Sequence, residues 1–116
     1  MSSDPHPVDV VLLIRDLLFS SKAVAAAKAK GVAYKVVRDV SKLIDVAGNR
    51  LIADLSQDGA LEAALEWKQR TDGHVTGFLP HVAGDLIARA RELGIDRVMS
   101  NGAISTQMED VVAPRE

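Results

Sequence analysis

The chain has 116 residues, of which 47% are apolar and 26% are charged, and its formal net charge at pH 7 is −2. This size and balance predict one globular domain with its own core, and they exclude a disordered chain or one whose bulk charge attracts nucleic acid. The sequence contains no cysteine, which excludes disulfides, thiolate metal sites and thiol catalysis.

The sequence carries no sign of a membrane segment or a secretion signal. No apolar run approaches the roughly 20 residues that a spanning helix needs, and residues 1–7 are polar. With no cysteine to suggest an oxidising compartment, we expect a cytoplasmic protein without a membrane partner. Basic residues lie scattered among acids and aromatic residues are few, so we expect no binding of nucleic acid.

Short β-rich runs alternate with helical runs along the chain. Residues 10–14, 32–37, 49–55, 75–79 and 96–100 have the apolar content and alternation of strands. Between and after them, the spacing of apolar residues predicts helices over residues 20–30, with Ser20 and Ser21 as the cap, and over 40–48, 61–72, 82–93 and 104–112.

Five strand–helix units in series require right-handed crossovers, and therefore a parallel sheet covered on both faces. The count and length predict a flavodoxin-like, doubly wound α/β fold of three layers, with a five-stranded parallel sheet in the order 2-1-3-4-5. The domain should span residues 8–112, between an N-terminal tail over residues 1–7 and a C-terminal tail over residues 113–116.

Two aspartates follow predicted strands. Asp16 comes after the first strand and Asp54 after the third. Because open α/β folds carry their sites at the carboxyl ends of the strands, both carboxylates should lie at that edge. Transfer of a phosphoryl group to a carboxylate also needs a divalent cation held by oxygen ligands, a hydroxyl group and a positive charge.

Over residues 8–112, the chain resembles the receiver domain of two-component response regulators. The resemblance rests on the register of strands and helices, on Asp16, on Asp54 after residues 51–53, and on the closing stretch over residues 93–98. In that family the aspartate after the third strand accepts a phosphoryl group in a phosphorelay. The resemblance therefore implies that Asp54 is the candidate phosphoacceptor and that the chain is a signalling module rather than an enzyme.

Three pocket positions depart from the family pattern. Where receivers usually have two adjacent acidic residues after the first strand, this chain has Arg15 and Asp16. The position of the usual hydroxyl residue falls on Leu79, and that of the usual lysine falls on Asn101, which is followed by glycine. These changes resemble the atypical, or pseudo-receiver, branch of the family. Asp16 and Asp54 would hold Mg²⁺ weakly, if at all, and we expect no other cofactor.

The pocket residues also have structural alternatives. Asp16 and Asp54 are suited to capping the backbone N–H groups that follow them, which leaves two roles open for each. Arg15 either points into the pocket, pairs with Asp16 or Asp54 and lowers its pKa, or lies in solvent at the end of the strand. We expect the first arrangement.

Other residues suggest contacts rather than chemistry. Leu17, Leu18 and Phe19 fall in a predicted loop, where they form either a partner surface or a lid over the first helix. The last strand and last helix suit a homodimer. His6, His74 and His81 lack the spacing of metal ligands, and we expect His81 to be a solvent-exposed loop residue.

We therefore expect a stand-alone receiver-like module with a degenerate phosphorylation pocket. It would act by protein–protein interaction with other signalling proteins, because only four residues follow the last predicted helix. One alternative is a working but atypical receiver that is phosphorylated on Asp54. The other is a small-ligand binding protein or enzyme on the same flavodoxin-like fold.

Overall fold

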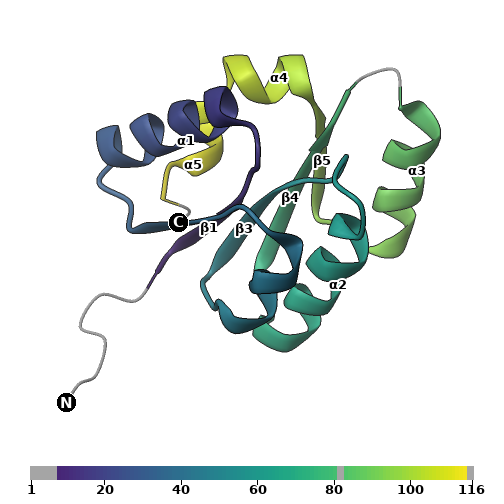
Figure 1. Ribbon diagram of the computed structural model, residues 1–116. Coiled ribbons are helices and arrows are strands. Elements are labelled where there is room, and N and C mark those ends of the chain that lie inside the picture. Colours follow the sequence, from purple (N-terminus) through teal and green to yellow (C-terminus); the bar gives the residue numbers. More distant parts are fainter. Residues whose placement is uncertain (1–7, 81–82, 115–116) are drawn as a thin grey trace.

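The computed structural model describes residues 8–80 and 83–114, and its centre is a parallel sheet of five strands (Figure 1). The strands are β1 (Val10–Leu13), β2 (Tyr34–Val37), β3 (Arg50–Asp54), β4 (His74–Leu79) and β5 (Arg97–Ser100). Their order across the sheet is β2-β1-β3-β4-β5, and every neighbouring pair is parallel. This arrangement confirms the flavodoxin-like fold predicted from the sequence.

Helices cover both faces of the sheet and make the fold three layers deep (Figure 1). One core cluster joins the sheet to η1 (Val40–Asp45), α2 (Ala60–Thr71) and α3 (Gly84–Leu93). A second cluster on the opposite face joins it to α1 (Leu17–Ala29), α4 (Asn101–Thr106) and α5 (Met108–Val112). Within these ranges no helix has both the length and the apolar composition needed to cross a membrane.

The inner strand β1 supplies side chains to both core clusters. Val11 and Leu13 pack on the face of α2, whereas Val10 and Leu12 pack on the face of α1. Successive side chains of a strand point to opposite faces, so a strand between two helical layers is apolar at every position. This is why a continuous run of apolar residues marks β1 in the sequence.

Three helices differ from their sequence-predicted form. The first begins at Leu17 rather than near Ser20, because Asp16 caps it. The segment predicted as a helix over residues 40–48 is the short 3₁₀ helix η1, since the backbone is extended again at Val46. The predicted last helix is divided at Gln107 into α4 and α5, and α4 already begins at Asn101. The predictions for His6, for His81 and for the helix start at residue 82 lie outside the described residues.

A buried arginine fixes the C-terminal helix to the sheet. Arg50, at the start of β3, is only 5% exposed, and its Nη2 donates to the Asp9 carboxylate at 2.9 Å. The guanidinium also donates to the carbonyl oxygens of Val111, Val112 and Ala113 at 3.2, 2.9 and 2.7 Å. The last carbonyls of a helix have no partner within it, so Arg50 supplies donors that α5 would otherwise lack.

Candidate functional site

The residues predicted to form the pocket follow four of the five strands at one edge of the sheet. Arg15 and Asp16 follow β1, Asp54 ends β3, Leu79 ends β4, and Asn101 follows β5 as the first residue of α4. The chain leaves β1 towards β2 and leaves β3 towards β4, so a crevice opens between the carboxyl ends of β1 and β3. The five residues share this edge, but their side chains serve different purposes.

Asp16 is the N-cap of α1. Its Oδ1 accepts a hydrogen bond from the backbone N–H of Phe19 at 3.0 Å, and its own backbone is extended, with φ −67° and ψ 128°. A carboxylate at this position also interacts favourably with the positive end of the helix dipole. The capping alternative for Asp16 is therefore confirmed.

Asp54 closes a turn after β3. Its Oδ1 accepts hydrogen bonds from the Ser56 backbone N–H at 3.0 Å and from the Ser56 hydroxyl at 2.6 Å. Nearby, the half-buried Gln57 amide donates to the carbonyl oxygens of Leu13 and Asp54 at 3.4 and 3.5 Å, which bridges the ends of β1 and β3. The candidate phosphoacceptor thus lies at the expected edge, with one carboxylate oxygen held by its own loop.

Arg15 is exposed, and within residues 8–80 and 83–114 it forms no ion pair with Asp16 or Asp54. The pairing expected from the sequence is wrong. Arg15 instead lines a cavity of about 420 Å³ that Arg38 and Asp39 also line, and its carbonyl oxygen accepts a hydrogen bond from Arg38 Nη1 at 3.4 Å.

Asp39, after β2, repeats the turn seen at Asp54. Its Oδ1 accepts from the backbone N–H and the hydroxyl of Ser41 at 3.0 and 2.8 Å. These two bonds are the main reason that the pKa of Asp39 lies below its ordinary value, and the positive charges of Lys42 and Arg15 lower it further. Asp39 was not recognised from the sequence, although an aspartate after a strand and two residues before a serine is the signal for such a turn.

The other two pocket positions supply neither a hydroxyl group nor a positive charge. Leu79 is 1% exposed and packs in the core with Ala53 and Val98, so it contributes to stability rather than to a pocket. Asn101 is half-buried, and its Oδ1 is buried with no hydrogen-bond partner among the described residues. Its neighbour Ser100 caps α4 by accepting from the Ala103 N–H at 3.1 Å.

Leu17, Leu18 and Phe19 form the first turn of α1, so the expectations of a loop there and of a lid over that helix are wrong. Phe19 is half-buried, and its ring lies 5.3 Å from that of Phe78, which stands opposite Asp54 in the sheet register. Leu17 and Leu18 are 65% and 83% exposed in the first turn of α1. One residue of the three therefore packs inward, and the other two form an exposed apolar pair.

Metal ligands do not cluster at this edge among the described residues. Within the described ranges, no three His, Asp or Glu side chains gather closely enough to hold a metal ion. Mg²⁺ and Ca²⁺ require several oxygen ligands, and Asp16 and Asp54 each bind their own loop instead.

The fold is that of the receiver domains of response regulators. HP1043, an orphan response regulator of H. pylori, matches with a TM-score of 0.71 and 15% identity over 90% of this chain and 96% of that chain. The Mn²⁺-bound response regulator Rcp1 matches with a TM-score of 0.74 and 15% identity over 90% and 91%. The receiver domain of RcsB from Salmonella enterica serovar Typhimurium matches with a TM-score of 0.69 and 13% identity over 89% and 83%.

No protein-family model and no curated protein matches the amino-acid sequence. The likeness to these solved structures, at 13–15% identity, establishes the architecture alone.

Proposed function

We propose that this chain is a non-enzymatic, receiver-like signalling module that acts through contacts with other signalling proteins, and that its phosphorylation pocket is degenerate. The receiver fold supports the first part. The second part rests on one observation, the engagement of Asp54 Oδ1 by both the N–H and the hydroxyl of Ser56. A phosphoryl group or metal ion at that oxygen would have to displace both bonds.

The other predicted pocket residues supply few groups that would stabilise a phosphoryl group on Asp54. Phosphoryl transfer needs positive charge and hydrogen-bond donors placed where negative charge develops. Here Asp16 caps α1, Leu79 lies in the core, and Asn101 carries no charge. The module would accordingly hold one conformation without a phosphoryl group, and Mg²⁺ would not be required for its contacts.

The partner surface that we propose includes Leu17 and Leu18. Single exposed apolar residues are common, but two adjacent leucines with most of their surface in water favour a contact site. Self-association through β5 and the last helix has less apolar surface to use, because Met99, Met108 and Val112 are buried in this chain's own core. A homodimer there would rely on the open edge of β5 and on polar side chains.

Incubation with acetyl phosphate and Mg²⁺, followed by intact mass spectrometry, tests the proposal. We expect the wild-type mass to remain unchanged under conditions in which a working receiver gains one phosphoryl group. A gain in the wild type that is absent from Asp54→Asn would instead show that the chain is an atypical but functional receiver.

A further inference from the structure

A polar cavity lies at the carboxyl edge of the sheet, among the loops that follow β1, β2 and β3. Its volume is about 420 Å³, and its lining comprises Arg15, Arg38, Asp39, Val40, Gln57 and Asp58. This size falls within the roughly 300–1,000 Å³ of small-molecule sites. The position is also the one that open α/β sheets use for ligands, beside the point where the chain changes direction across the sheet.

Two arginines from different loops line this cavity. Arg38 Nη1 donates to the carbonyl oxygen of Arg15 at 3.4 Å, which links the loop after β2 to the loop after β1. Within the described part of the chain, neither guanidinium forms an ion pair. Each therefore keeps most of its donors available, and the planar fork of a guanidinium matches the oxygens of a phosphate group.

Carboxylates line the same cavity. Asp39 is fixed by its bonds to Ser41 and its lowered pKa keeps it ionised near neutral pH, while Asp58 comes from the loop after β3. An ionised carboxylate only accepts hydrogen bonds, so these residues suit hydroxyl groups of a ligand rather than its phosphate. The lining thus offers both donors for an anion and acceptors for hydroxyls.

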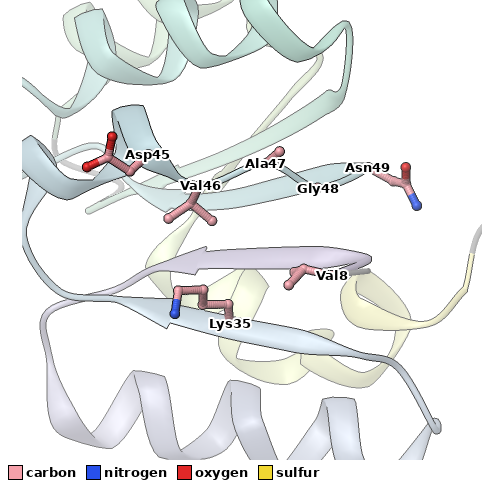
Figure 2. A pocket seen from close by; sticks show the side chains of 7 residues that line it. All are labelled: Val8, Lys35, Asp45, Val46, Ala47, Gly48 and Asn49. Carbon is pink, nitrogen blue, oxygen red and sulfur yellow. The ribbon is translucent and has the colours of Figure 1, made fainter. Parts of the chain in front are cut away.

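A second cavity has fewer positive charges in its lining than the cavity with Arg15 and Arg38. The groove beside β2 is larger, about 560 Å³, and is lined by Val8, Lys35 and residues 45–49. Figure 2 shows Lys35 on β2, with Asp45 and Val46 on the segment across from it. This groove offers a phosphate one cation where the arginine cavity offers two.

We propose that the cavity between Arg15 and Arg38 binds a small phosphorylated ligand that also carries hydroxyl groups, such as a sugar phosphate. Arg15 and Arg38 would hold the phosphate, and Asp39 and Asp58 would accept from the hydroxyls. The inference goes beyond the proposed function, because it gives the module an input that does not involve a phosphoryl group on Asp54. It needs no metal ion and no covalent step.

The test is a titration of the full chain with ribose 5-phosphate, inorganic phosphate and ribose, followed by backbone amide resonances. We expect saturable shifts at residues 15, 38–40 and 57–58, with ribose 5-phosphate binding more tightly than phosphate and ribose not binding. Arg15→Gln and Arg38→Gln should each weaken binding on the order of 10-fold, the usual effect of losing hydrogen bonds to a charged group.

Lys35→Gln is the matched control, since it removes the same charge beside the other groove. Both arginines are exposed, so their variants should keep the wild-type amide spectrum elsewhere. Absence of saturable shifts with both phosphates in the wild type would overturn the proposal. An equal loss in Lys35→Gln would also overturn it, because the binding would then follow net charge. Neither outcome bears on phosphorylation of Asp54, which is measured without these ligands.

Discussion

Asp16, Asp39 and Asp54 follow three different strands, and each accepts a hydrogen bond from a backbone N–H two or three residues further along the chain. The carboxylates at this edge therefore shape the loops in which they stand. Oδ1 of each carboxylate is engaged by its own loop, and a metal ion at that oxygen would compete with these hydrogen bonds.

Replacement of Asp16 separates the capping role from the charge. Asp16→Ala removes the acceptor for the Phe19 N–H and should lower the free energy of unfolding by about 0.5–2 kcal/mol. Asp16→Asn keeps an equally good capping group and loses only the charge at the end of the helix dipole, so it should lower the free energy of unfolding by about a few tenths of a kcal/mol. Denaturant unfolding of the two variants is the measurement. Equal losses would mean that the charge, rather than the hydrogen bond, stabilises α1.

Asp96 gives a prediction for the pH dependence of stability. Burial by itself raises the pKa of Asp96, but hydrogen bonds from Lys68 Nζ at 2.7 and 3.0 Å and from the Val75 N–H at 2.8 Å outweigh it and hold the pKa below its ordinary value. Because the pKa of Asp96 is lower in the folded state, ionised Asp96 stabilises the fold at pH values above its unfolded-state pKa of about 3.9. This stabilisation is lost as the pH falls through the folded-state pKa.

Comparison of the wild type with Asp96→Asn between pH 7 and pH 2 checks this sign. The side chains of Lys68 and Asp96 remain 32% and 29% exposed, so the difference at neutral pH should be about 1 kcal/mol or less. It should shrink as the pH falls below about 4. A difference that grows in acid would contradict the assignment.

Sequence patterns predicted where the pocket residues lie better than they predicted which contacts these residues make. Arg15, Asp16, Asp54 and Asn101 all lie at the predicted edge, because strand register alone fixes that placement. The pairing of Arg15 with Asp16 or Asp54 was predicted wrongly, because strand register does not determine the contacts of an exposed side chain in a loop. Arg50 gave no local signal at all, since its acceptors lie 41 residues away at Asp9 and 61 to 63 residues away at the end of α5.

At the scale of elements, the strands were easier to predict than the segments after them. Buried strands of a parallel sheet are short apolar runs that remain visible in any context. The spacing of apolar residues over residues 40–48 is also typical of a helix. The structure nevertheless forms only the six residues of η1, and the backbone is extended at Val46. The division at Gln107, between α4 and α5, was likewise not visible in the spacing of apolar residues.

The attachment of α5 to the sheet by Arg50 yields a stability prediction. Arg50→Ala would leave Asp9 Oδ2 and the carbonyl oxygens of residues 111–113 without the donors that Arg50 supplies, and it should cost about 3–5 kcal/mol in the free energy of unfolding. Amide exchange in α5 should accelerate more than exchange in α2. Denaturant unfolding and hydrogen exchange are the measurements.

Arg70→Ala is the matched control for that experiment. Arg70 also donates to two backbone carbonyls, those of Leu43 and Val46 at 3.1 and 3.2 Å, but it is exposed. Its loss should cost about 1 kcal/mol. Similar costs for both arginines would show that burial of the Arg50 charge adds nothing to its effect.

The whole molecule combines a receiver fold with an edge of the sheet at which three aspartates bind their own loops. Two arginines line a cavity at the same edge. Fold and chemistry are thus separable here, because the architecture depends on buried apolar residues and the site depends on loop residues.

We propose that Asp54, whose Oδ1 is held by Ser56, does not bind a phosphoryl group or a metal ion. The decisive measurement is a titration with Mg²⁺ and beryllium fluoride, a mimic of a phosphoryl group on aspartate, followed at the Ser56 backbone amide. We expect this resonance to stay in place throughout the titration. A saturable shift at Ser56 that disappears in Asp54→Asn would show that Asp54 does bind the mimic.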